Sequence, residues 1–121
     1  KTIHRRFEEI DKKYQKLLSK AKKEGLSGNL LFFKYAGETS MSADIANGLK
    51  FAFPEKVIVV CRTKGERVSL SIRGKGIREK VVKLIEKIPG ATGGGHEDAV
   101  GAQMSEKDLE QFEKDIRLLV K

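Results

Sequence analysis

The residues with the clearest chemical potential are three consecutive glycines and the histidine that follows them, Gly93, Gly94, Gly95 and His96. Consecutive glycines cost conformational entropy, so a folded protein keeps them where the backbone has positive φ or approaches another group closely. Successive backbone N–H groups in such a stretch can form a nest that binds an anion. His96 can donate a further hydrogen bond to a phosphate or a base. A tight structural turn with an exposed histidine explains the same residues equally well.

Two basic side chains lie at the end of an expected strand: Arg73 ends the strand, and Lys75 lies between the two glycines that follow it. A guanidinium pairs with phosphate through two hydrogen bonds, and an ammonium adds a compact charge. An arginine at a strand end is also a common surface residue without a role. If the sheet brings Arg73 beside the glycines, one anion-binding site results. We therefore predict a substrate-binding set, with no catalytic and no metal-binding residue, made of Arg73, Lys75, Gly93, Gly94, Gly95 and His96.

Several other kinds of site do not match the spacing. No Lys-Ser or Lys-Thr pair follows the glycines as in a nucleotide P-loop, and the dinucleotide fingerprint is absent. The tetrapeptide at residues 90–93 matches the bare GxxG of a KH domain, which stays a weaker alternative. One cysteine and two distant histidines, His4 and His96, exclude a disulfide and a zinc knuckle. Glu97 and Asp98 offer no carboxylate set for two metals, so hydrolysis by this chain alone is not expected.

Length and composition suit one globular domain. The chain has 121 residues, of which 39% are hydrophobic and 35% charged. Its longest apolar run, residues 57–61, is far too short to span a bilayer, and we see no signal-peptide pattern. We therefore expect a soluble, cytoplasmic protein without membrane contact. Because an amphipathic pattern is already under way at Lys1, we also expect a fragment of a longer protein.

Positive charge is concentrated in the first two thirds of the chain. The net charge is +8, and residues 1–76 hold 17 of the 25 basic residues but only 8 of the 17 acidic ones. Such an excess attracts phosphate-bearing partners such as nucleic acid through Coulomb forces and counterion release. A Lys/Glu-rich solvated surface of a heat-adapted protein explains the charge equally well.

Hydrophobic periodicity predicts an α/β sandwich in which helices cover a mixed sheet. We expect helices over residues 2–24, 43–53 and 77–87, strands over 29–35, 56–63 and 67–73, and a final strand within the glycine-rich stretch 90–104. Ser42 is expected to cap the second helix, and Ser105 with Asp108 to form a capping box for a closing helix.

The remaining distinctive side chains are interpreted as core. Cys61 lies in a β-branched run and is expected to be a buried packing thiol rather than a nucleophile. Four phenylalanines match core positions better than stacking platforms, namely Phe32, Phe33, Phe51 and Phe53.

The arrangement of these motifs resembles a known family, the DHH-associated domain that follows the catalytic domain of RecJ-like exonucleases and related phosphodiesterases. The resemblance rests on a hairpin whose second strand ends at Arg73, on the helix after it, and on the motif Gly93-Gly94-Gly95-His96-x-x-Ala99-Val100-Gly101-Ala102. It is strongest to an archaeal RecJ-like nuclease related to the replication-fork factor Cdc45. Two positions depart from the pattern: Thr92 stands where many members have glycine, and Val100 where alanine is common.

This resemblance implies a division of the chain and a function. Residues 1–27 would be a connector helix, and residues 28–121 a domain that holds single-stranded DNA or RNA through Arg73, the glycines and His96. This chain would need no cofactor, because manganese or magnesium would be bound by the DHH domain, which it lacks. The partners would be single-stranded nucleic acid, the DHH catalytic domain of the same protein, and replication proteins such as GINS. The parent protein would be a single-strand-specific exonuclease of replication and repair.

Two other functions stay open. The fold could serve as a protein-interaction module in a replication complex. It could also bind tRNA, because a related domain ends alanyl-tRNA synthetases. Those versions usually lack a histidine after the glycines, so His96 favours the nuclease branch.

Overall fold

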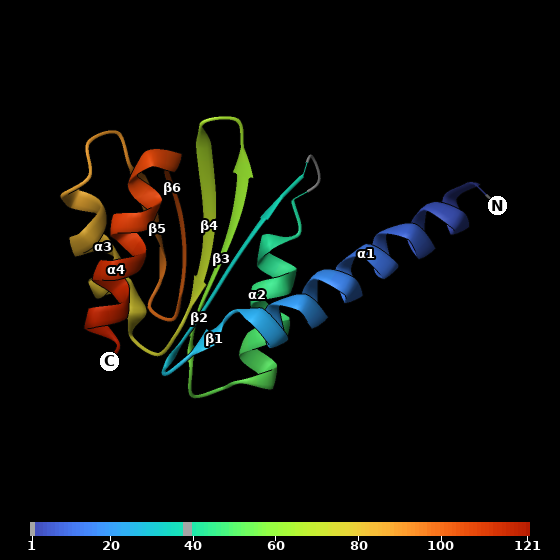
Figure 1. Ribbon diagram of the computed structural model, residues 1–121, viewed down its shortest axis with the longest axis horizontal. Helices are drawn as coiled ribbons and strands as arrows, with labels where there is room; N and C mark the ends of the chain where they lie inside the picture. The colour runs from blue at the N-terminus through green and yellow to red at the C-terminus, as the bar shows by residue number, and fades with distance from the viewer. Residues whose placement is uncertain (1, 38–39) are drawn as a thin grey trace.

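The computed structural model describes the backbone of residues 2–37 and 40–121, and the side chains of residues 9–37 and 40–121 (Figure 1). The side chain of His4 lies outside this part. Helices and strands follow the order α1 (Thr2–Glu24), β1 (Leu26–Ser27), β2 (Leu30–Ala36), α2 (Ser42–Ala52), β3 (Val57–Lys64), β4 (Arg67–Arg73), α3 (Ile77–Glu86), β5 (Thr92–His96), β6 (Ala99–Ser105), a short 3₁₀ helix (Glu106–Asp108) and α4 (Leu109–Leu119). No helix in the described part is long and apolar enough to cross a membrane.

The strands form one six-stranded mixed sheet in the order β1-β2-β3-β4-β6-β5. β2 and β3 are parallel, joined by the crossover helix α2, and all other neighbours are antiparallel. An α/β fold with helices on a mixed sheet, preceded by a long amphipathic helix, is therefore confirmed.

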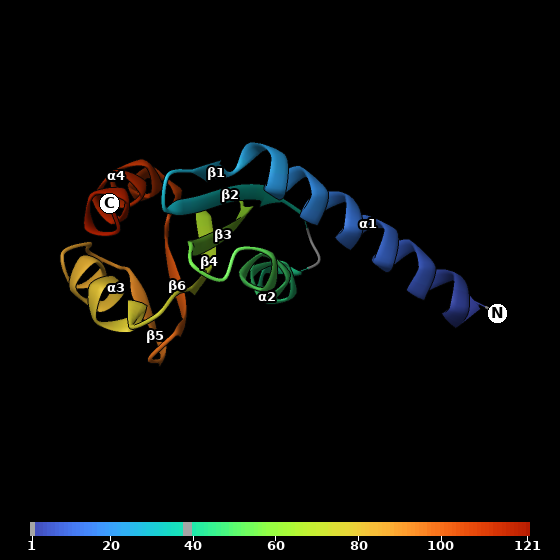
Figure 2. The ribbon, with the colours of Figure 1, turned by 90° about the horizontal axis from the view of Figure 1, so that it is seen from below.

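Helices pack on both faces of the sheet, and alternate residues of each strand point to one face or the other. α3 and α4 cover one face over a core that includes Val59, Leu70, Val100 and Phe112. α2 and the end of α1 cover the other face over β2 and β3, and α2 also contacts part of β4. Figure 2 shows the two helix layers on opposite sides of the sheet, with α1 extending beyond it. The second face is thus open over β6 and β5.

The residues at the start of α2 and at the start of the 3₁₀ helix do not cap these helices as expected. Met41, not Ser42, precedes α2, and the buried Ser42 hydroxyl is 2.9 Å from the Tyr35 hydroxyl. The Ser42 hydroxyl therefore pairs with a buried side chain and not with a backbone N–H of α2, so the predicted cap is wrong. Ser105 precedes the 3₁₀ helix without a side-chain capping bond, so the predicted capping box is also wrong.

The sequence pattern also missed two strands. β1 has only two residues and β5 contains a run of glycines, so neither shows the alternation of apolar residues that indicates a strand.

The core prediction holds for Cys61 and for part of the phenylalanine set. Cys61 is fully buried, and this burial, more than the nearby Glu113 carboxylate, raises the pKa of its thiol far above the usual range. Phe33 is buried, and Phe32 and Phe53 are half-buried against the two core clusters. Phe51 is 90% exposed, so its assignment to the core is wrong. It lies two positions after the inward-facing Leu49, which on a helix is nearly the opposite side.

Candidate nucleic-acid interface

Three rows of small and polar residues cross β4, β6 and β5 on the open face of the sheet. Their neighbours along β6, Val100, Ala102 and Met104, are buried under α3 and α4, so the intervening residues must face the other way. From the β5–β6 turn upward the rows are Arg73-Ala99-His96, Ser71-Gly101-Gly94 and Ser69-Gln103-Thr92. We name these nine residues the open strip.

The open strip carries Arg73 and His96 at one end. Both residues pair in register with Ala99, one from each side. They are therefore two strand spacings apart, about 10 Å between Cα atoms. Ala99 is too short to fill the space between the guanidinium and the imidazole. The sheet thus brings the predicted arginine and histidine to the same place on one face.

The twelve glycines of the chain, all in the described part, are of two kinds: those that the backbone or the packing requires, and those that it does not. Ten of them have a positive φ or an atom within 3.2 Å of the place that a β-carbon would take: at Gly93 it would lie 2.6 Å from the Ile85 side chain, and Gly95 combines a φ of 156° with contact to the Ala99 carbonyl. Gly94 and Gly101 have neither constraint. They pair directly across β5 and β6. Glycine inside a strand costs roughly 0.5–1 kcal/mol relative to alanine, and nothing in the fold requires it at these two positions.

The three predicted glycines adopt strand geometry rather than a loop. Gly93, Gly94 and Gly95 belong to β5, an exposed edge strand. Successive N–H groups of a strand point in opposite directions, so they cannot converge on one anion as a nest would. The predicted nest is therefore wrong. What the glycines provide is a bare strand surface on which a ligand can approach the backbone closely.

The guanidinium of Arg73 is held in place from two sides. Its Nε donates to Asn47 Oδ1 on α2 at 2.9 Å, and Nη1 donates to the Ile72 carbonyl at 3.0 Å. Partial burial lowers its pKa below the usual range of a guanidinium, which still leaves it protonated near neutral pH. Within the described residues it forms no ion pair with a carboxylate. Its charge is thus positioned but not neutralised.

Lys75 lies beside the same end of the open strip, in the connection from β4 to α3. The N–H of Gly74 donates to the Asp98 carbonyl at 3.0 Å, and the N–H of Gly76 donates to Asp98 Oδ1 at 2.8 Å. Gly76 has a φ of 63°, which glycine adopts without strain. The β4–α3 connection and the β5–β6 turn are therefore joined, and the exposed Lys75 lies beside the turn that follows His96.

Asn47 is a site residue that the sequence did not indicate. It orients Arg73 from α2, which precedes that arginine by more than twenty residues. The apolar pattern of α2 places Asn47 away from the core, but the pattern does not specify which strand end lies beside it. A tertiary contact of this kind has no local sequence signal.

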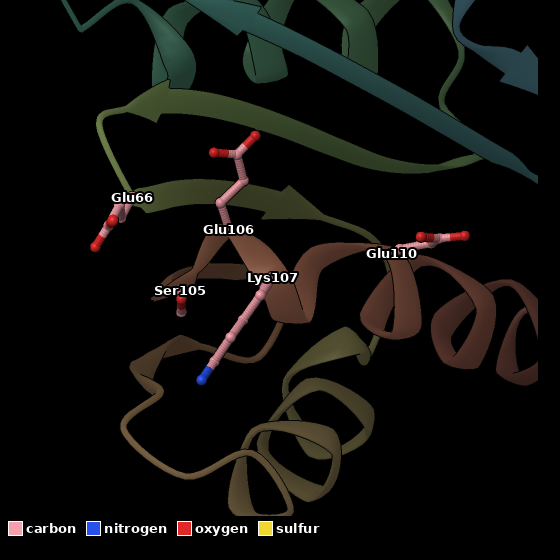
Figure 3. Close-up of a pocket in the computed structure, with 5 residues that line it drawn as sticks. All are labelled: Glu66, Ser105, Glu106, Lys107 and Glu110. Atoms are coloured by element: carbon pink, nitrogen blue, oxygen red, sulfur yellow. The ribbon is translucent and has the colours of Figure 1, made fainter.

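Two of the surface hollows differ in charge, one being neutral and the other acidic. One of about 270 Å³ lies over the open strip and is lined by Ser69, Thr92, Gly101 and Gln103 among others. Another of about 580 Å³ lies where β4 and the 3₁₀ helix begin (Figure 3). Its lining side chains are Glu66, Ser105, Glu106, Lys107 and Glu110. Three carboxylates against one ammonium repel phosphate, so the larger hollow is unsuited to nucleic acid.

Metal chemistry finds no support in the described residues. They contain no cluster of three or more His, Cys, Asp or Glu side chains that could hold an ion. Glu97 and Asp98 occupy the β5–β6 turn, where Asp98 is engaged by the N–H of Gly76. These residues do not suit the manganese or magnesium ions that the resemblance implies for the DHH domain.

Comparison with known families agrees with this architecture. The profile of the DHHA1 domain matches residues 27–121, nearly the whole chain after α1. The chain belongs to the DHHA1 domain family. This membership makes it the associated domain of a DHH-family protein, and Gly94 and His96 of the glycine-histidine motif on which the resemblance was based lie in the open strip. Comparison with curated protein sequences gave no match.

Two solved structures are similar to this DHHA1 domain in fold. The C-Ala domain of Aquifex aeolicus alanyl-tRNA synthetase has a TM-score of 0.54 at 19% identity, over 78% of this chain and 91% of that one. The pGpG-specific phosphodiesterase PggH of Vibrio cholerae has a TM-score of 0.60 at 16% identity, over 93% of this chain. This chain spans only 40% of the phosphodiesterase. At such identities the likeness concerns the fold alone.

Proposed function

We propose that this DHHA1 domain is the substrate-binding part of a RecJ-like phosphoesterase, and that the open strip holds the phosphate end of single-stranded DNA or RNA. The observation that carries the proposal is the pair Gly94 and Gly101. These glycines have no role in the packing of the fold, and they keep a bare surface in the row next to the one that holds Arg73, Ala99 and His96. Glycine at these positions is explained if a ligand approaches the strand backbone closely.

Each residue of the site has a distinct part in this proposal. Arg73 pairs with phosphate oxygens through the part of its fork that Asn47 and Ile72 leave available. His96 donates a hydrogen bond to a phosphate or a base, and Lys75 adds charge at the same end. The net charge of +8 supports attraction of the strand from a distance.

The chemical step belongs elsewhere in this proposal. A DHH domain of the same protein binds manganese or magnesium and cleaves the phosphodiester bond, while the DHHA1 domain fixes the strand end relative to those ions. In this arrangement residues 1–27 connect the two domains. The parent protein acts in the cytoplasm as an exonuclease of replication and repair, with partners such as GINS.

Binding of an internally labelled oligothymidylate, followed by fluorescence anisotropy, tests the proposal. Loss of a charge-assisted hydrogen bond costs roughly 1.5–3 kcal/mol, so Arg73→Ala should weaken binding about 10- to 150-fold. Arg67→Ala is the matched control, because Arg67 is exposed on the same strand and face, about 20 Å away. Gly94→Val should also weaken binding, by filling the open strip with a residue that strands accept.

The result that contradicts the proposal is equally plain. Wild-type affinity in both Arg73→Ala and Gly94→Val, or equal losses in Arg73→Ala and Arg67→Ala, would mean that the open strip does not hold the strand. Affinity should also fall steeply with salt, because each neutralised phosphate releases counterions.

Binding of folded RNA is the second candidate, and it is favoured by the similarity to an alanyl-tRNA synthetase domain over 91% of that chain. The two functions separate in a competition experiment. Unlabelled tRNA and unlabelled oligothymidylate each compete with the labelled oligothymidylate for the domain. If tRNA displaces the labelled oligomer at the much lower concentration, the domain binds folded RNA. If the unlabelled oligothymidylate does so, the exonuclease function is favoured. The protein-interaction alternative predicts weak binding of both.

A further inference from the structure

Phe51 is the feature of the surface that the proposed phosphate site does not use. Its side chain is 90% exposed, whereas the other large exposed hydrophobic side chains of the described part are aliphatic, namely Ile10, Leu26, Leu118 and Leu119. An aromatic ring open to water on both faces contributes nothing to the core. Nothing in the folding of α2 requires a phenylalanine there, because Ile45, Ala46 and Leu49 make the helix's core contacts.

Phe51 lies one helical turn from the residue that orients Arg73. Asn47 and Phe51 are at positions i and i+4 of α2, which places their Cβ atoms about 6 Å apart on one side of the helix. Asn47 Oδ1 accepts the hydrogen bond from Arg73 Nε at 2.9 Å. The ring and the guanidinium are therefore separated by a distance that one or two nucleotides can span.

The topology places Phe51 at the same end of the sheet as Arg73. α2 connects the parallel strands β2 and β3, so it runs opposite to them and in the same direction as β4. Arg73 ends β4, and Phe51 lies in the last turn of α2. Both elements finish at the lower end of the sheet in Figure 1, where the β5–β6 turn with His96 also lies.

We propose that Phe51 is a stacking platform for a nucleobase of the strand whose phosphate lies at Arg73. This inference rests on the proposed function and adds a base subsite to it. A nucleobase stacks on an exposed aromatic face whatever its identity, so the subsite distinguishes a strand that carries bases from a bare sugar-phosphate chain. Phosphate contacts alone fix position and carry no such preference.

The chain contains no tryptophan, so Phe51→Trp installs a single fluorescent reporter at the subsite. Titration with an octathymidylate should quench its emission, because a stacked base quenches indole fluorescence. Titration with an abasic octamer of the same length should leave the emission near its starting value. Leu118→Trp, on the exposed side of α4, is the matched reporter and should not respond to either oligomer. Quenching of both reporters alike, or of neither, would overturn the proposal.

Affinities of unlabelled octamers, measured by calorimetry, separate this subsite from the phosphate site. Phe51→Ala should weaken binding of the octathymidylate about 5- to 100-fold and leave the abasic octamer unchanged. Leu118→Ala should change neither affinity, and Arg73→Ala should weaken both. If Arg73→Ala weakens both oligomers while Phe51→Ala keeps the wild-type ratio between them, the base subsite is wrong and the proposed function stands. If Arg73→Ala changes neither affinity, the proposed function fails first.

Discussion

The two halves of the sheet differ in what covers them. Strands β2 and β3 are packed on both faces, by α2 with the end of α1 on one side and by the core cluster beneath α3 and α4 on the other. Strands β6 and β5 are packed only against α3 and its neighbours, and their second face is bare. The covered half has large apolar side chains under α2, whereas the corresponding positions of β6 and β5 hold Ala99, Gly101, Gln103, Thr92, Gly94 and His96.

This difference separates residues that serve folding from residues that do not. In the covered half each side chain that faces α2 fills space, as Ile58 and Val60 do. In the open half Gly94 and Gly101 fill none and satisfy no backbone requirement. Substitutions in the two halves should therefore have different signatures: loss of stability in one, and loss of binding in the other.

The largest effect is expected in the covered half. Leu49 is fully buried between α2 and the sheet, and Leu49→Ala removes that packing and leaves a cavity. We expect a loss of roughly 2–5 kcal/mol in the free energy of unfolding, measured by urea denaturation followed by circular dichroism. Phe51→Ala on the same helix is the control and should change stability by less than about 0.5 kcal/mol. Equal losses in the two variants would contradict the burial described here.

The covered half of the sheet was predicted from the sequence more accurately than the open half. The covered half has strong apolar alternation or continuous apolar runs, so β2, β3, β4 and three helices were predicted within one or two residues. Strand β5 consists of Thr92, three glycines and His96, and its pairing with β6 is a property of the tertiary fold. Local pattern could not distinguish it from a loop, and the nest that we predicted followed from that error.

The site itself could be predicted only in part. The residue types of Arg73, Lys75 and His96 indicated anion chemistry, but their proximity depends on the register of three strands, which a sequence does not display. The position of Asn47 beside Arg73 depends on how α2 crosses the sheet. Phe51 was assigned to the core together with the other phenylalanines, whereas the helix turns Phe51 outward.

A medium effect is expected for one of two adjacent glycines. Gly95→Ala forces a side chain into a φ of 156° and into the Ala99 carbonyl, so we expect a loss of about 1–3 kcal/mol in unfolding free energy. Gly94→Ala meets no atom within 4 Å and should leave stability unchanged or raise it by up to about 1 kcal/mol. Thermal denaturation of both variants checks this difference. Similar destabilisation in the two would mean that Gly94 serves folding after all, which would remove the main support for the open strip as a ligand surface.

The smallest effects concern the charges of the two hollows. Gln103→Glu places a carboxylate on the open strip without changing side-chain size, and repulsion of phosphate there should weaken binding of the oligothymidylate several-fold, about 1 kcal/mol. Glu110→Gln removes a carboxylate from the acidic hollow on the other side of the sheet, where its only described ion pair is the exposed contact with Lys114 at 3.6 Å. At physiological salt the Debye length is about 8 Å, so this change should alter affinity less than twofold. Anisotropy titrations at low and physiological salt compare the two, and the response to Gln103→Glu should shrink as salt rises. An equal or larger effect of Glu110→Gln would mean that the strand passes over the acidic side, because only a nearby phosphate senses a single charge in water.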